Sequence, residues 1–198
     1  MKRKSCEVTD PEVIEKILSK ATIGRLATID LEGYPYITPV NFVSHNGNIY
    51  FHCALTGEKL DNITRNAKVG FQIDRPLAYL DSQFSDDGSP CKLHQFYHCV
   101  VIRGTARVVD EMQLKLDALN ALVEKHEKGR SLEKVHEEMP AYKTCALVEI
   151  QPQRISAKSD LAQGKPENVR AELAEYFRKR NWPKDPETIK EMGLDPDK

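Results

Sequence analysis

The dipeptide Asn46-Gly47 constrains the fold of this chain more than any other short feature. It separates two apolar, β-rich runs, "PVNFV" at 39–43 and "IYFHC" at 49–53. The two central positions of a tight hairpin loop take positive φ, which Asn and Gly tolerate better than other residues. The two runs are therefore predicted to pair as antiparallel neighbours in one hairpin.

Strand and helix patterns follow one another on both sides of this hairpin. Hairpin-linked strands with helices inserted between them indicate a mainly β fold, a small antiparallel barrel, rather than a parallel βαβ sheet. No G-x-G-x-x-G turn or P-loop is present, which argues against a Rossmann-type dinucleotide site. We expect strands at 23–29, 35–43, 49–53, 68–74, 96–110 and 144–151, helices at 8–21, 58–66, 110–127 and 167–180, and a long irregular excursion at 75–95.

Length and charge limit the classes of partner. The 198 residues suit a domain over 1–157 followed by a polar, helical tail over 158–198. With 29 basic and 30 acidic residues, the net charge of −1 offers no general attraction to nucleic acid or to an anionic membrane. No run reaches the roughly 20 apolar residues of a membrane span. Five scattered cysteines indicate reduced thiols and a cytoplasmic protein.

The stretch "IYFHCALTGEKLDNITRN" at 49–66 holds the strongest candidate site. A strand ends there, a loop of small residues follows, and a helix then begins. The start of a helix offers backbone N–H donors and a favourable dipole to a phosphate. Thr56 adds a hydroxyl, Gly57 permits close approach, and Lys59 adds a positive charge; Arg65 is a second cation if the helix turns it that way. The alternative is an ordinary surface helix with solvated charges.

His52 and Cys53 lie at the end of the same strand but on opposite faces, so only one of them can face a given ligand. His52 is a candidate proton donor or ring-orienting group, or else a structural histidine. Cys53 fits a small buried apolar residue better than a nucleophile, because no base accompanies it.

"CKLHQFYHC" at 91–99 raises the question of a metal site. Cys91, His94, His98 and Cys99 are all zinc-ligand types. Their spacing differs from the usual paired motif, and His98 and Cys99 would point to opposite faces of a strand. Whether these side chains bind metal stays open.

Three segments in this order resemble a known family: "IGRLATIDLEGYPYITPVNFV", "GNIYFHCALTGEKLDNITRNAKVGFQID" and "FYHCVVIRGTARVV" followed by "ALVEI". They are similar to the flavin-binding split-barrel proteins related to pyridoxamine 5′-phosphate oxidase, most of all to the 5-nitroimidazole-resistance (Nim-type) reductases. The resemblance covers about residues 8–156. It implies a homodimeric, antiparallel split β-barrel that binds FMN, or alternatively FAD, at the dimer interface.

The resemblance also implies which residues contact the flavin. The strand at 38–41 would follow the isoalloxazine ring, residues 52–54 would line the ring and ribityl chain, and Lys59 with the loop from Thr56 would hold the phosphate. The strand at 97–100 would approach from the partner subunit. The candidate cofactor-binding residues are Thr38, Pro39, Val40, Asn41, His52, Cys53, Ala54, Thr56, Lys59, Asn62, Tyr97 and Cys99, with His52 as the candidate catalytic residue.

The chain also departs from the family pattern. The oxidase grips the phosphate with Ser-Arg-Lys, where this chain has Gly57, Glu58 and Lys59. Cys99 stands where relatives commonly have serine, and the C-terminus lacks the basic, substrate-gripping end of the oxidase. Oxidation of vitamin B6 is therefore not expected.

These residues leave three hypotheses on function. The first is an FMN-dependent oxidoreductase that passes electrons, from a reduced nicotinamide or another donor, to a small acceptor such as a nitroaromatic compound. The second is a flavin- or haem-binding carrier or sensor without turnover, with His45, His94 and His98 as haem candidates. The third is a zinc-binding interaction domain.

Overall fold

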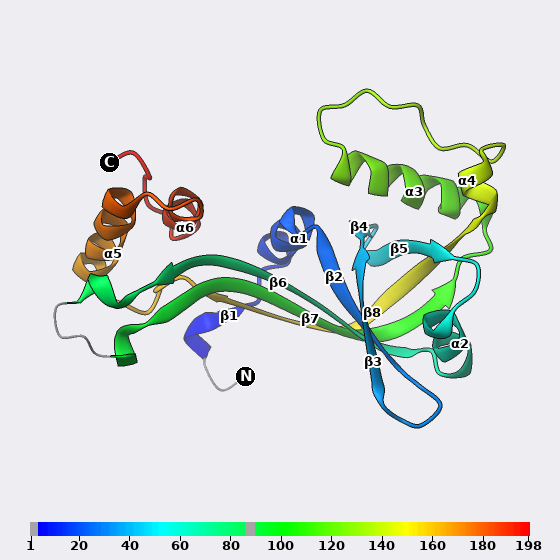
Figure 1. The fold of residues 1–198 in the computed structure, drawn as a ribbon, viewed down its shortest axis with the longest axis horizontal. Coiled ribbons are helices and arrows are strands. Elements are labelled where there is room, and N and C mark those ends of the chain that lie inside the picture. The colour runs from blue at the N-terminus through cyan, green and yellow to red at the C-terminus, as the bar shows by residue number, and fades with distance from the viewer. Residues whose placement is uncertain (1–3, 86–89) are drawn as a thin grey trace. The chain divides into compact units, whose positions relative to one another are not determined.

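The computed structural model describes residues 4–85 and 90–198. Its mainly antiparallel sheet has the strand order β3-β2-β6-β7-β8-β5-β4, with β1 paired to β8 (Figure 1). The predicted mainly β fold with inserted helices is confirmed. No helix in the described ranges is both long and apolar enough to cross a membrane.

The chain divides into two compact units that interleave along the sequence. We call residues 11–73 and 100–156 the barrel unit, and residues 1–10, 74–99 and 157–198 the hairpin unit. The predicted division into a domain over 1–157 and a tail over 158–198 stays a prediction. The long strands β6 (Lys68–Leu80), β7 (His94–Val108) and β8 (Cys145–Asp160) contribute residues to both units.

Four further strands and four helices complete the barrel unit. The strands are β2 (Ile23–Ile29), β3 (Pro35–Asn41), β4 (Val43–His45) and β5 (Asn48–Ala54). The helices are α1 (Pro11–Lys20), α2 (Glu58–Arg65), α3 (Met112–His126) and α4 (Pro140–Lys143).

The Asn46-Gly47 turn forms as predicted, with φ of 50° and 80° at the two residues. It joins β4 to β5, and His45 pairs with Asn48 directly across it. The predicted partner strand at 35–43 is not continuous, however. Phe42 is fully buried and separates β3 from β4, so that β3 pairs with β2 and only β4 pairs with β5.

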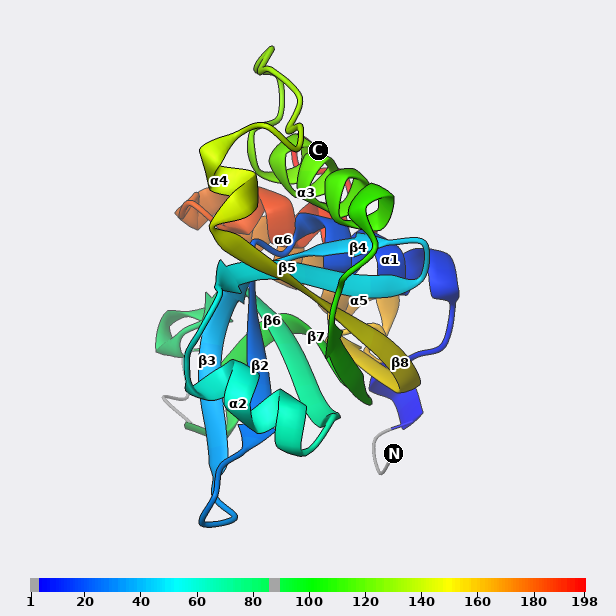
Figure 2. The ribbon, with the colours of Figure 1, turned by 90° about the vertical axis from the view of Figure 1, so that its right-hand side faces the viewer.

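The core of the barrel unit lies on both faces of β5. Phe51 on one face is fully buried, and it lies opposite Val148 of β8. On the other face, Tyr50 and Leu147 belong to a cluster with Ala118, Leu119 and Leu122 of α3. Figure 2 shows α3 lying over β4 and β5. The apolar stripe of this helix therefore covers the sheet face around Tyr50, whereas His52 on the same face stays exposed.

The hairpin unit has short elements and two C-terminal helices. These are η1 (Lys4–Cys6), β1 (Glu7–Val8), η2 (Ser82–Phe84), η3 (Pro90–Lys92), α5 (Glu167–Arg180) and α6 (Asp185–Glu191). The excursion predicted at 75–95 is wrong at its two ends, because β6 continues to Leu80 and β7 begins at His94. Its residues 86–89 lie outside the described part of the chain.

Apolar residues from distant parts of the sequence build the core of the hairpin unit. Leu77 and Phe96 come from β6 and β7, Phe177 from α5 and Ile189 from α6. The Phe96 and Phe177 rings meet edge to face at 5.4 Å. The strands extend to Leu80 and from His94 because α5 and α6 cover them.

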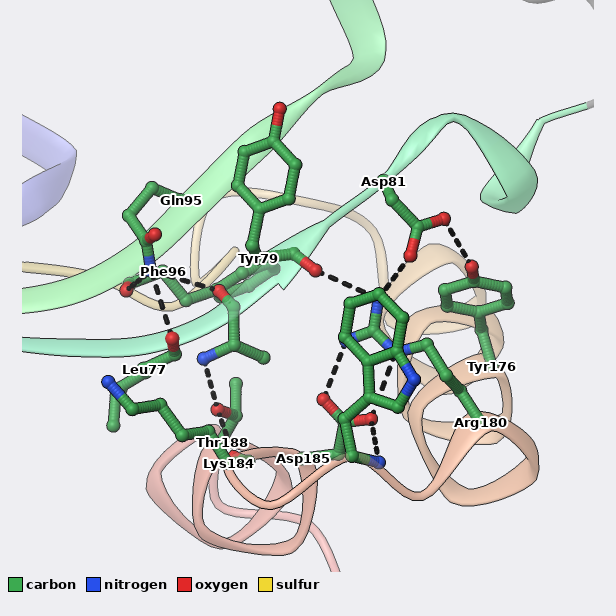
Figure 3. A network of polar contacts seen from close by, with 12 residues as sticks. Leu77, Tyr79, Asp81, Gln95, Phe96, Tyr176, Arg180, Lys184, Asp185 and Thr188 are labelled. Carbon is green, nitrogen blue, oxygen red and sulfur yellow. Dashed lines mark hydrogen bonds and ion pairs between the residues drawn. The ribbon is translucent and has the colours of Figure 1, made fainter.

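A polar cluster joins the two C-terminal helices to the end of β6 (Figure 3). We call Asp81, Tyr176, Arg180, Trp182 and Asp185 the Arg180 cluster. The Arg180 guanidinium donates to both oxygens of Asp185 at 2.6 and 3.0 Å, to Asp81 at 2.6 Å and to the Tyr79 carbonyl at 2.9 Å. It also lies 3.9 Å from the centre of the Trp182 ring. Each charge of the cluster therefore has a partner within the chain.

Candidate functional site

The end of β5 presents His52, Cys53 and Ala54, and it leads through residues 55–57 into α2. We call these residues and the first turn of α2 the rim. His52 lies opposite Leu147 and is exposed, whereas Cys53 lies opposite Ala146 and is half-buried. The two side chains occupy opposite faces of the strand, as the alternation predicts.

Cys53 carries a half-buried thiol. Burial raises its pKa, and the neighbouring Lys59 ammonium offsets only part of that effect. A raised pKa lowers the fraction of thiolate, which is the nucleophilic form. This interaction also shows that Lys59 lies within electrostatic range of the end of β5.

The N-terminus of α2 is shaped by Gly57. Its φ of 139° and ψ of 160° belong to a region that favours glycine, and its carbonyl accepts hydrogen bonds from Leu60 N at 2.8 Å and Asp61 N at 3.2 Å. No side chain caps this end of the helix. Because the first N–H groups of a helix lack intrahelical acceptors, this end can accept an anionic ligand.

Thr56 and Lys59 flank this helix start. Thr56 is exposed and Lys59 is half-buried. Within residues 4–85 and 90–198, neither Lys59 nor His52 makes a hydrogen bond or an ion pair through its side chain. The rim therefore has a cation and a histidine that are available to a ligand.

Asn62 and Arg65 make contacts away from the start of α2. Asn62 is 2% exposed, and its amide nitrogen donates to Thr28 Oγ1 at 3.1 Å. Arg65 donates to Asn62 Oδ1 at 2.8 Å and to the Ile29 carbonyl at 2.7 Å. Arg65 lies in the last turn of the helix, so the positive charge at the helix start comes from Lys59 and not from Arg65.

The predicted ring-contacting strand is β3, which lies at one end of the strand order. Thr38 and Val40 point to its more buried face, whereas Pro39 and Asn41 are exposed. The Thr38 hydroxyl is buried and has no hydrogen-bond partner among the residues that the structure describes. A buried hydroxyl without a partner costs free energy. Thr38 and the open edge of β3 thus provide unused polar groups in the strand that the resemblance assigns to the ring.

Tyr97 and Cys99 belong to the hairpin unit, whereas the other predicted site residues belong to the barrel unit. Both are half-buried and share one face of β7, opposite the buried Phe96 and His98. Their predicted role as flavin contacts from a partner subunit stays a prediction.

The metal and haem candidates have protein neighbours. His98 is 3% exposed, with its Nδ1 2.6 Å from Ser159 Oγ and its Nε2 3.6 Å from a Glu191 carboxylate oxygen. His94 Nε2 lies 3.4 Å from Asp160. His45 is half-buried, its ring nitrogen lies 3.2 Å from the Asn46 amide, and Cys91 is exposed. Among the described residues, no three His, Cys, Asp or Glu side chains gather in a metal-binding arrangement.

Two contributions near the site escaped the sequence analysis. Gly24 of β2 lies so close to Phe71 that a Cβ atom would come within 2.0 Å of the ring. Thr28 of β2 is 1% exposed and accepts the hydrogen bond of Asn62. Gly24 and Thr28 alternate with Leu26 along the buried face of β2. A glycine and a polar residue at such inward-facing positions are the features of the sequence that could have indicated their roles.

Two clefts lie away from the rim, one in each unit. One, of about 1090 Å³, lies in the barrel unit between α3, β4 and residues 127–135. The other, of about 930 Å³, lies in the hairpin unit beside α5. Neither is lined by His52, Lys59 or Thr38.

Comparisons with known proteins agree with this arrangement of strands. Similar solved structures include a proposed 5-nitroimidazole antibiotic resistance protein from Bacteroides thetaiotaomicron, with 22% identity, a TM-score of 0.63 and coverage of 77% of this chain and 85% of that one. An FAD- and heme-binding protein from Mycobacterium smegmatis has 16% identity, a TM-score of 0.67 and coverage of 85% and 79%. The flavocytochrome Anf3 from Azotobacter vinelandii has 17% identity, a TM-score of 0.64 and coverage of 78% of this chain and 69% of that one.

At these identities the similarity concerns the fold, and the predicted split barrel is confirmed. No significant match was found among curated protein sequences. The model of the family described as pyridoxamine 5′-phosphate oxidase matches residues 10–159. The match spans most of the chain, and the protein therefore belongs to the pyridoxamine 5′-phosphate oxidase family.

Proposed function

We propose that the protein binds FMN at the rim and is an FMN-dependent oxidoreductase that reduces a small acceptor, such as a nitroaromatic compound. One observation carries the proposal: Lys59 lies beside an uncapped helix start that is entered through Gly57, next to the end of β5. Family membership and the named flavin-binding proteins of the same fold support it.

The residues of the rim and of β3 fit the chemistry of FMN. A phosphate monoester needs N–H donors and a cation, which the start of α2, Thr56 and Lys59 provide. The unpartnered Thr38 hydroxyl and the open edge of β3 can bond to the polar edge of the ring. When bound, FMN supplies the two-electron redox chemistry through its ring system.

The side chains at the end of β5 have different tasks in this proposal. His52 is exposed and is free to orient the ring or to donate a proton to the acceptor. Burial raises the pKa of Cys53, and its side chain lies on the face of β5 opposite to that of His52, so only one of the two side chains can face the ring. The chain is expected to bind FMN in preference to FAD, and a reduced nicotinamide is the expected electron donor.

We further propose a homodimer with flavin at its interface, located in the cytoplasm. Exposed apolar residues of the β2–β3 hairpin, namely Ile29, Leu31, Tyr34 and Ile37, lie next to the open edge of β3 and suit a contact with a second copy. In such a dimer, Tyr97 and Cys99 would come from the partner subunit. All five cysteines are free, which suits a reducing compartment.

A non-catalytic flavin- or haem-binding protein is the second candidate function. It is favoured by the fold similarity to a protein described as FAD- and heme-binding and to a flavocytochrome. For haem it ranks below the first candidate, because His98 and His94 lie against Ser159, Glu191 and Asp160.

The absorption spectrum and the released cofactor of the purified protein test the proposal first. We expect a flavin spectrum, FMN as the released cofactor, and catalytic oxidation of a reduced nicotinamide when a nitroaromatic acceptor is added. Pyridoxamine 5′-phosphate should be left unoxidised. Bound flavin without turnover would favour the carrier, a Soret band would favour haem, and a protein that refuses added FMN would contradict flavin binding altogether.

A further inference from the structure

Helix α2 is attached to the sheet by a buried chain of hydrogen bonds. Asn62 donates to Thr28 Oγ1 at 3.1 Å, and the Thr28 hydroxyl donates to the Tyr36 carbonyl at 3.5 Å. Arg65 donates to Asn62 Oδ1 and to the Ile29 carbonyl. The chain thus joins α2 to β2 and β3 within the barrel unit.

Both polar atoms of the Asn62 side chain take part in this chain. The amide nitrogen contacts Thr28 and the amide oxygen contacts Arg65, while Asn62 and Thr28 are only 2% and 1% exposed. A buried amide that loses one of these partners pays a desolvation penalty. The side chain is thereby held inside the protein rather than offered to a ligand.

The position of α2 determines where Lys59 and the free N–H groups point. The helix has only eight residues, from Glu58 to Arg65, so a displacement at one of them moves the others with it. Lys59 precedes Asn62 by three positions, and residues three apart lie on the same side of a helix. A rotation or shift of the helix at Asn62 would therefore move the Lys59 ammonium and the helix start together.

We propose that Thr28, Asn62 and Arg65 are positioning residues that aim the start of α2 at the phosphate of the flavin, and that Asn62 does not itself contact the flavin. This inference rests on the proposed flavin site. It replaces the role of Asn62 as a cofactor ligand with a role exerted through Lys59 and the backbone N–H groups of the helix.

A pair of substitutions at Thr28 isolates this role. Thr28→Val keeps the shape of the side chain but removes the hydroxyl, and Thr28→Ser keeps the hydroxyl. The affinities of the whole protein for FMN and for riboflavin, which lacks the phosphate, are measured for each variant. Thr28→Val should weaken FMN binding by about 10-fold, the scale of one lost hydrogen bond, and riboflavin binding by less than about 2-fold. Thr28→Ser should match the wild type.

Hydrogen exchange of the flavin-free protein provides the second readout. Thr28→Val should speed the exchange of the backbone amides of residues 60–66, and Arg65→Met should do so to a smaller extent because Arg65 is exposed. Equal losses of affinity for FMN and riboflavin, or unchanged exchange in α2, would overturn the positioning role. Wild-type protein that binds neither flavin contradicts the proposed function itself. If the wild type binds FMN but Thr28→Val has the same ratio of FMN affinity to riboflavin affinity as the wild type, only this inference is contradicted.

Discussion

The Arg180 cluster and the rim each contain a cation near buried surface, but only the cation of the Arg180 cluster is paired with carboxylates of its own chain. Arg180 has an 8% exposed side chain and is bonded to two carboxylates and a carbonyl (Figure 3). Lys59 lies at an uncapped helix start and makes no hydrogen bond or ion pair through its side chain within the described residues. A cation whose partners belong to its own chain holds elements together, whereas a cation without them is available to a ligand.

This contrast predicts that the two cations affect different measurements. Arg180 should matter for the stability of the hairpin unit, and Lys59 for ligand affinity. The predictions below follow the expected change in the free energy of unfolding, from the largest to the smallest.

Arg180→Met should cause the largest loss of stability. It leaves the Asp185 carboxylate, which is 1% exposed, without its charged partner, and breaking a buried pair from one side costs about 3–5 kcal/mol. Urea unfolding followed by the fluorescence of Trp182, the only tryptophan, measures the change.

Lys179→Ala is the matched control for Arg180→Met. Its side chain is 75% exposed beside Glu175, so the change should stay within about 0.5 kcal/mol. Equal effects of the two substitutions would contradict the structural role of the Arg180 cluster.

Acid should weaken the hairpin unit through Asp81. Burial acts to raise the pKa of Asp81, but hydrogen bonds from Tyr176, the Gln83 backbone and Arg180 outweigh it, so the folded pKa lies below the ordinary value of 3.8. A lowered folded pKa stabilises the protein above the unfolded pKa, and this stabilisation is lost as the pH falls through the folded value. The free energy of unfolding should therefore decline below about pH 4.

Asp81→Asn tests this acid dependence. The variant should be less stable than the wild type at neutral pH and should lose less stability between about pH 4 and pH 2. Parallel acid curves for the two proteins, followed by Trp182 fluorescence, would show that Asp81 is not responsible. Because Asp81 is partly exposed, this effect should be smaller than that of Arg180→Met.

Local sequence signals predicted the part of the fold that depends on neighbouring residues. The Asn46-Gly47 turn and the extent of α5 both follow from residues within a few positions. The break at Phe42 and the extension of β6 to Leu80 were missed, because both depend on packing against residues far away in the sequence.

The candidate site divides in the same way. The helix start, Gly57 and Lys59 could be recognised from their order along the chain, and the structure gives them the expected local conformation. The engagement of Asn62 could not be recognised, since its partner Thr28 lies 34 positions away. The unpartnered hydroxyl of Thr38 likewise depends on burial, which only the folded chain reveals.

Lys59→Ala tests the central claim most directly, through the affinities for FMN and riboflavin. Lys68→Ala, at another lysine of the barrel unit, is the control. Each of the two substitutions should change the free energy of unfolding by less than about 0.5 kcal/mol. Lys59→Ala should weaken FMN binding by about 1–3 kcal/mol, the scale of a lost charged hydrogen bond, and leave riboflavin binding unchanged. An unchanged FMN affinity, or an equal loss for both flavins, would contradict the assignment of the rim as the phosphate site.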